Sequence, residues 1–191
     1  MKILKRIGLV VVIIVGLVII VGVFLPSQYE VSRSLQIEAP AAVVFAQVND
    51  LKKMAAWSPW EEADPTLKTT YGDVTVGKGA TSSWSSESSG SGTMEIVESV
   101  PNKSLAVALD FGEMGNADGY WTLVETGDGV KATWGFRGDA GWDIPGRYFG
   151  LAMDSMVGPF YDKGLANLKR VAEAVPPPPA EEPAADPVEP T

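Results

Sequence analysis

The sequence of 191 residues contains no cysteine and no histidine. Their absence excludes metal sites built from thiolate or imidazole ligands, cysteine nucleophiles, and catalytic triads or acid–base steps that depend on histidine. Without cysteine there is also no disulfide framework from which a redox compartment could be read. Carboxylates, Tyr, Lys, Arg, Ser and Thr are the groups that remain for chemistry, and we expect neither a bound metal nor a cofactor.

Basic side chains are scarce as well. The chain has 15 Lys and Arg against 24 Asp and Glu, which gives a net charge of -9. Proteins that bind nucleic acid neutralise its phosphates with a basic patch or stripe, and this composition offers none. We therefore expect no nucleic-acid partner, and the acidity mainly supports solubility.

Charge is missing altogether from residues 7–25, which read IGLVVVIIVGLVIIVGVFL. A helix rises about 1.5 Å per residue, so this stretch covers roughly the 30 Å hydrocarbon core of a bilayer. Its β-branched residues do not argue against a helix, because in lipid every backbone polar group must be bonded within the segment. The sequence predicts a transmembrane helix over 7–25.

The distribution of basic residues around this helix predicts its orientation. Lys2, Lys5 and Arg6 precede it, whereas the stretch that follows offers only Arg33. The positive-inside rule places residues 1–6 in the cytoplasm and the remainder of the chain outside the bacterial inner membrane.

A cleaved signal peptide is the alternative reading of the same segment. The apolar stretch is longer than the usual 7 to about 15 residues of a signal peptide, and no small-x-small pair precedes Pro26 or Ser27. We therefore expect an uncleaved single-pass anchor, followed by a linker over 26–30.

Two short-range patterns follow the linker. Apolar and polar side chains alternate over 31–37, which predicts a half-buried strand. Val44, Val48 and Leu51 then recur at helical spacing, so we expect a short helical pair within 39–57, with a break near Asn49 and Asp50.

Six further segments are strand-like, and each is bounded by Gly, Pro, Asn or Asp. They cover residues 67–71, 79–86, 92–99, 104–111, 117–125 and 129–137. Their short connections predict an antiparallel meander. The Ser- and Gly-rich residues 88–92 read as a mobile loop.

The chain ends in a helical segment and a tail. Apolar residues recur at helical spacing over 146–175, and Gly158-Pro159 should interrupt or kink this helix because Pro removes a backbone donor. Residues 176–191, PPPPAEEPAADPVEPT, have almost no apolar bulk and carry only acidic charge. They predict a disordered acidic Pro-rich tail, either a solvated terminus or a docking strip.

The order of strand, helical pair, six-stranded meander and long closing helix resembles the START-like (SRPBCC) superfamily, the polyketide cyclase/dehydrase-like group. The resemblance lies in IEAPAAVVFAQVNDLKKMAAWSPWEEADP, GSGTMEIVESVPN and MDSMVGPFYDKGLANLKRVAEA. It implies one domain over 31–175 with an α+β helix-grip fold, in which an antiparallel sheet of about seven strands wraps around the C-terminal helix. Members of the group bind lipids, sterols, hormones or polyketides, and some catalyse ring closure or dehydration.

Large aromatic and thioether side chains are the candidates for lining an apolar cavity between sheet and helix, since rings and flexible thioethers suit apolar ligands. Core packing is the alternative role for each of them, although in a helix-grip fold the core face and the cavity wall are the same surface. The candidates are Trp57, Trp60, Trp84, Tyr120, Trp134, Phe136, Met153 and Met156.

The leading hypothesis is a membrane-tethered module that binds a hydrophobic small molecule or lipid. A cyclase- or dehydratase-like enzyme is the alternative, and it would need a buried carboxylate or a Tyr/Arg pair. We assign no catalytic residue, because the polar candidates read as surface or turn positions: Asp110, Asp118, Arg137, Asp139 and Asp143. A third hypothesis is an envelope scaffold that contacts a protein partner through its sheet edge or tail.

Overall fold

The computed structural model describes residues 2–176, so the predicted tail lies, apart from Pro176, outside the described residues. The chain forms helices and one sheet in an α+β arrangement. In chain order the elements are α1 (Lys2–Phe24), β1 (Gln28–Ile37), α2 (Ala41–Val48), α3 (Leu51–Met54), α4 (Trp60–Ala63), β2 (Lys68–Tyr71), β3 (Thr81–Ser86), β4 (Gly90–Val100), β5 (Ser104–Asp110), η1 (Gly112–Met114), β6 (Asn116–Thr126), β7 (Gly129–Asp139) and α5 (Ile144–Glu173).

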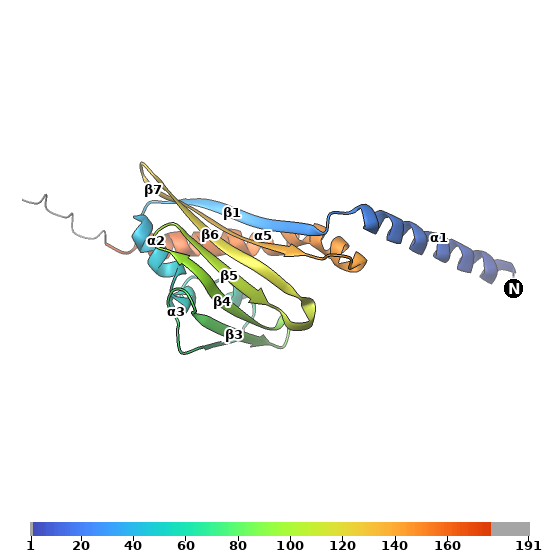
Figure 1. The fold of residues 1–191 in the computed structure, drawn as a ribbon, viewed down its shortest axis with the longest axis horizontal. Helices are drawn as coiled ribbons and strands as arrows, with labels where there is room; N and C mark the ends of the chain where they lie inside the picture. The colour runs from blue at the N-terminus through green and yellow to red at the C-terminus, as the bar shows by residue number, and fades with distance from the viewer. Residues whose placement is uncertain (1, 177–191) are drawn as a thin grey trace, which may run out of the picture.

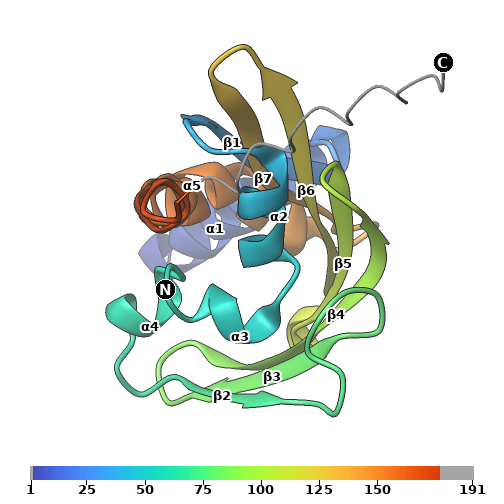
Figure 2. The same ribbon diagram turned by 90° about the vertical axis from the view of Figure 1, so that its left-hand side faces the viewer.

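The sheet has seven strands in the order β1-β7-β6-β5-β4-β3-β2, and every neighbouring pair is antiparallel. It curves around the helices, with α5 packed along β1 and β7 and the short helices α2 to α4 on the same concave side (Figures 1 and 2). A register shift between Ile96 and Glu98 of β4 marks a bulge, which bends a strand locally. This arrangement confirms the predicted helix-grip fold.

α1 projects away from the sheet and is continuous with the domain through β1 (Figure 1). Its Lys5–Phe24 stretch is long and apolar enough to cross a membrane, which fits a single-pass anchor or a signal sequence. The expected linker over 26–30 is shorter in the structure, because β1 already begins at Gln28 and pairs there with Asp139. Only residues 25–27 separate α1 from the sheet.

The predicted helical pair is present and breaks where the sequence indicates. α2 ends at Val48, and the Asp50 carboxylate accepts hydrogen bonds from the backbone N–H groups of Lys52 (3.0 Å) and Lys53 (3.4 Å) to start α3. The following turn forms a further helix, α4, that the sequence did not predict. Together these helices cross from one edge strand, β1, to the other, β2.

The Ser-rich stretch 88–92 is only in part the loop that we predicted, because residues 88 and 89 lie in a turn and the rest do not. Residues 90–92 belong to β4, and the turn before them is fixed to the Asp64 carboxylate. That carboxylate accepts hydrogen bonds from the hydroxyls of Ser86, Ser88 (2.6 Å) and Ser89 (2.9 Å). A single buried carboxylate thus orders a turn whose composition suggested mobility.

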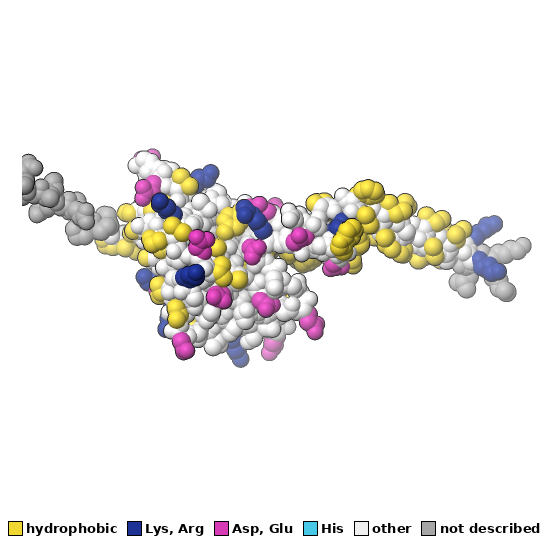
Figure 3. Space-filling model, in the orientation of Figure 1, with side chains coloured by type: hydrophobic (Ala, Val, Ile, Leu, Met, Phe, Trp, Pro, Cys, Tyr) yellow, Lys and Arg dark blue, Asp and Glu magenta, His cyan; other side chains and the backbone are white. Residues whose placement is uncertain are grey.

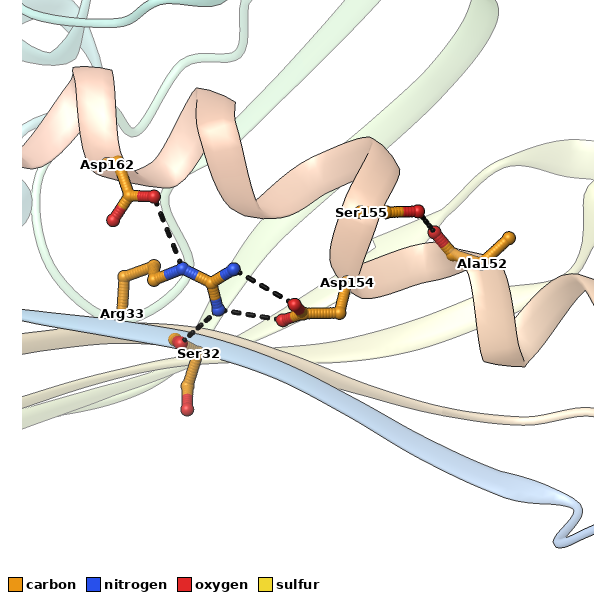
Figure 4. A network of polar contacts seen from close by, with 6 residues as sticks. All are labelled: Ser32, Arg33, Ala152, Asp154, Ser155 and Asp162. Atoms are coloured by element: carbon orange, nitrogen blue, oxygen red, sulfur yellow. Dashed lines mark hydrogen bonds and ion pairs between the residues drawn. The ribbon is translucent and has the colours of Figure 1, made fainter.

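α5 continues through Gly158-Pro159 without interruption, and its axis bends near Asp154 and Ser155 (Figure 4). Arg33 of β1 lies beside this bend. Its guanidinium donates to Asp154 (2.7 Å) and Asp162 (3.3 Å), both on α5. Gly158 leaves the room for this, since a Cβ there would clash with the guanidinium. The ion pairs, one turn before and one turn after Gly158, fix the bent helix to the sheet.

Candidate ligand-binding site

Four aromatic rings fill the space between the sheet and α5. Trp121 of β6 and Trp134 of β7 are cross-strand partners whose rings stack at 4.9 Å, and Tyr161 of α5 stacks on Trp134 at 4.0 Å. Trp57, which is 1% exposed, lies nearly perpendicular to both tryptophan rings, with 5.6 Å between ring centroids. This part of the interior is therefore closed by side chains and is not a cavity.

Tyr161 is a central member of the cluster that the sequence reasoning missed. Its burial raises the pKa of the phenol well above the ordinary tyrosine value, so the hydroxyl stays protonated. Helical periodicity could have identified Tyr161, because it lies four residues before Leu165 and seven before Leu168, on the same buried helical face.

Burial on the concave face changes from one end of the sheet to the other. The register aligns Tyr29, Gly138, Ala117, Leu109 and Met94 in one row across five strands, at the end of the sheet next to α1. Tyr29, Leu109 and Met94 in this row are only half-buried, whereas the side chains of the next row are buried. The next row consists of Val31, Phe136, Gly119, Val107 and Ile96.

Other apolar side chains extend this half-buried row. Trp84 of β3 lies over Gly92 of β4 and meets the edge of the Phe111 ring at 5.6 Å. Met153 of α5 is half-buried against the core from the helix side. We call the half-buried side chains of Trp84, Met94, Leu109, Phe111 and Met153 the anchor-side apolar face. The first four lie near the ends of β3 and β5 and the beginning of β4, which point toward α1 (Figure 1).

The predicted cavity residues thus separate into groups. Trp57, Trp134 and Phe136 belong to the closed interior, while Trp84 and Met153 belong to the anchor-side apolar face.

Two further residues of the predicted set, Trp60 and Met156, lie at the margins of α5. Trp60 is half-buried, and its ring stacks on that of Phe160 of α5 with 4.7 Å between the ring centroids. Met156 is largely exposed on the outer side of α5, so it does not line the space beneath the helix.

Tyr120 requires a correction. It neighbours the inward-facing Trp121, and successive side chains of a strand point to opposite faces, so it lies on the outer face of the sheet. There its ring lies over Gly135, its hydroxyl donates to the Glu30 carboxylate, and the Arg137 guanidinium lies 4.7 Å from its ring centroid. Tyr120 does not line the space between sheet and α5.

The polar candidates for catalysis lie outside the concave face. Asp110 and Asp118 belong to the outward set of β5 and β6, and Arg137 pairs with Glu30 at 3.2 Å on that same face. Asp139 and Asp143 lie at the exposed corner between β7 and α5. The structure brings none of these five groups together with the aromatic cluster.

Two hollows are present on the outer face of the sheet. One, of about 470 Å³, lies over β2 to β4, and the other, of about 320 Å³, lies over β4 to β6. Thr93 and Glu95, which point outward from β4, line both. Both hollows face away from α5, so neither is the space between sheet and helix in which the apolar ligand was expected.

The charged contacts around the site are structural. Figure 4 shows Arg33 held between Asp154 and Asp162, with a further hydrogen bond from Nη1 to the Ser32 carbonyl (2.8 Å). The Arg33 guanidinium holds the pKa of the Asp154 carboxyl below its usual range. These ion pairs position α5 over β1, and the five side chains of the anchor-side apolar face are themselves uncharged.

Solved structures share this fold. A protein of Chromobacterium violaceum superposes with a TM-score of 0.56 at 15% identity, covering 76% of this chain and 97% of its own. The AHSA1-like protein from Aeromonas hydrophila gives 0.52 at 18% identity, covering 76% and 92%. The di-domain ARO/CYC protein of the steffimycin biosynthetic pathway gives 0.55 at 10% identity, covering 76% and 51%.

At these identities the similarity establishes the fold alone. No curated protein matches the sequence significantly. The family described as "Polyketide cyclase / dehydrase and lipid transport", however, matches residues 28–173, which is the whole domain from β1 to the end of α5. The chain therefore belongs to the polyketide cyclase/dehydrase and lipid transport family.

Proposed function

We propose that the chain is a membrane-tethered protein that binds a hydrophobic small molecule or lipid on its anchor-side apolar face. The observation that carries this proposal is the gradient of burial along the concave surface. The far rows are closed by Trp57, Trp121, Trp134 and Tyr161, whereas the row nearest α1 leaves apolar side chains half-buried. Half-buried aromatic and thioether groups without charge suit an apolar ligand.

The family supports a ligand of this class, because its description includes lipid transport. The position of the face supports a source for the ligand. α1 passes into β1 through residues 25–27, and the row that begins at Tyr29 lies at the same end of the sheet. A lipid leaving the bilayer beside α1 would meet this end of the domain first.

The experiment uses two substitutions at adjacent positions of β5. Leu109→Trp adds bulk to the anchor-side apolar face, and Ala108→Trp adds the same side chain to the exposed outer face. The full-length chain and both variants would be purified in detergent and analysed by native mass spectrometry, followed by organic extraction of bound molecules.

We expect the wild type and Ala108→Trp to carry an apolar molecule that Leu109→Trp loses. If the wild type carries nothing and also fails to take up a fluorescent fatty acid, the binding proposal is wrong. If Ala108→Trp loses the molecule as readily as Leu109→Trp, the molecule does not bind on the anchor-side apolar face.

A further inference from the structure

The amino-terminal end of α5 packs against the last turns of α1, which no sequence pattern indicated. Gly22 makes the contact possible, because a Cβ there would clash with Ile144 and lie 3.0 Å from the Tyr148 ring. The Tyr148 hydroxyl donates to the Val18 carbonyl at 2.7 Å. Val18 lies six residues before Phe24 (24 − 18), or about 9 Å along a helix. The domain therefore contacts α1 not only at its last residues but also at Val18, within the apolar stretch.

Arg147 completes this contact. Its side chain is buried, and Nη1 donates to the carbonyls of Val23 (2.7 Å) and Leu25 (3.1 Å) at the end of α1. Nε donates to the Gly141 carbonyl at 2.9 Å. The last carbonyls of a helix have no partner within the helix, so one guanidinium satisfies them and fixes the corner between β7 and α5 beside α1.

Large apolar side chains surround this contact without being covered by the domain. They are Phe24 (84% exposed), Trp142 (83%), Phe149 (50%) and Leu151 (58%), which we call the interfacial surface. From Ile144 to Met153 the single charged residue is Arg147, which is buried. In Figure 3 hydrophobic side chains gather both along α1 and on the adjoining end of the domain.

We propose that the interfacial surface lies in the headgroup and upper acyl region of the bilayer that α1 spans, so that the domain is docked on the membrane and not merely tethered to it. The inference rests on the membrane tether of the proposed function. If the apolar stretch of α1 fills the hydrocarbon core, then Gly22 and Val18 lie within it, and the side chains that touch them lie at the membrane boundary. Tryptophan at that depth is typical of membrane proteins.

A contact with Arg147 holds the Trp142 ring in place at this boundary. The Arg147 guanidinium lies 5.2 Å from its ring centroid, so the ring is held although most of its surface is exposed. The exposed charged side chains nearby, Asp139 and Asp143, are acidic and would be repelled by anionic lipids, so electrostatic attraction does not explain the docking. The docking is therefore hydrophobic.

The absence of cysteine from the chain makes the test direct. Single substitutions Phe149→Cys and Leu151→Cys would each be labelled with a polarity-sensitive fluorophore in the full-length chain. Val15→Cys within α1 and Asp128→Cys at the β6–β7 turn, on the far end of the sheet, serve as matched controls. The labelled proteins would be reconstituted in phosphatidylcholine vesicles with brominated acyl chains, which quench fluorophores that contact lipid.

We expect probes at positions 149, 151 and 15 to lose most of their emission and the probe at 128 to keep it. Quenching at 15 without quenching at 149 and 151 overturns the docking and leaves the tether intact. Quenching at none of the positions overturns the tether and the docking together. Quenching at 128 equal to that at 149 also overturns the proposal, because the contact would not be specific to the interfacial surface.

Discussion

Replacing Trp134 with alanine is the most direct perturbation of the closed interior. Its side chain is 8% exposed and lies between Trp121 at 4.9 Å and Tyr161 at 4.0 Å, with the Trp57 ring nearly perpendicular to it at 5.6 Å. Truncation of a buried tryptophan to alanine costs about 3–5 kcal/mol. Domains of this kind are stable by about 5–15 kcal/mol, so Trp134→Ala should fold and be markedly less stable.

The matched control is Trp142→Ala, which removes the same side chain from a position that is 83% exposed. Its effect should stay within about 1 kcal/mol, the contribution of an exposed cation–π contact. For a domain of this size, 3–5 kcal/mol corresponds to a fall in melting temperature of about 10 °C or more. Thermal unfolding of the full-length proteins in detergent, followed by circular dichroism, would measure the difference.

A second measurement tests whether the lost stability reflects a cavity. Indole should fill the space vacated in Trp134→Ala and raise its melting temperature, while leaving Trp142→Ala unchanged. At a hundred times its Kd, a ligand specific for the folded state adds about 2.7 kcal/mol. Equal melting temperatures for the two variants would refute the account of a filled interior.

Three further predictions concern a turn, a carboxylate and the contact with α1. Gly129→Ala should cost more than about 2 kcal/mol in urea unfolding, because φ is +131° and a Cβ would clash with the Ile37 carbonyl, whereas Gly127→Ala meets nothing within 4 Å. Hydrogen bonds from Ser86 and its neighbours hold the pKa of Asp64 well below its usual range, so its stabilisation is present above the unfolded pKa of about 3.9 and is lost as the pH falls toward the folded value. Asp64→Asn should therefore lower the urea midpoint at pH 7, and the difference from wild type should narrow below about pH 4. Oxidation of the double variant Gly22→Cys with Ile144→Cys should form an intramolecular disulfide, seen as a mobility shift on gels, because a Cβ at position 22 lies 3.6 Å from that of Ile144.

The controls for the last two predictions use positions without the relevant contact. Asp128→Asn alters an exposed carboxylate of the β6–β7 turn, and an equal pH dependence there would contradict the role given to Asp64. Gly16→Cys with Ile144→Cys should not crosslink, because nothing lies within 4 Å of Gly16. Crosslinking of both pairs would show that α1 moves freely past α5.

Periodicity predicted most of the fold because it depends on neighbours in the chain. The strand over 31–37, the six segments of the meander and the break at Asn49 and Asp50 were all read from local patterns. α4 was missed because four residues are too few to show a period, and the order of the Ser-rich turn depends on Asp64, more than twenty residues earlier.

The site was harder to predict because it depends on contacts across the sheet. Tyr120 and Trp121 are adjacent aromatics, and composition does not reveal which of them faces inward. The phase could have been taken from Ala117 and Leu123, which are buried on the same face as Trp121. Arg147 was beyond sequence reasoning, since its partners are backbone carbonyls of α1 more than 120 residues away.

The direct passage of α1 into β1 has a mechanical consequence. β1 is an edge strand that pairs with β7 over its whole length, from Gln28↔Asp139 to Ile37↔Val130. A force that pulls the domain away from α1 acts along the axis of β1, perpendicular to its hydrogen bonds with β7. The bonds then bear the load together in shear, whereas a force across the strand would open them one after another. The connection to α1 therefore pulls on β1 in the direction in which its pairing with β7 resists force best.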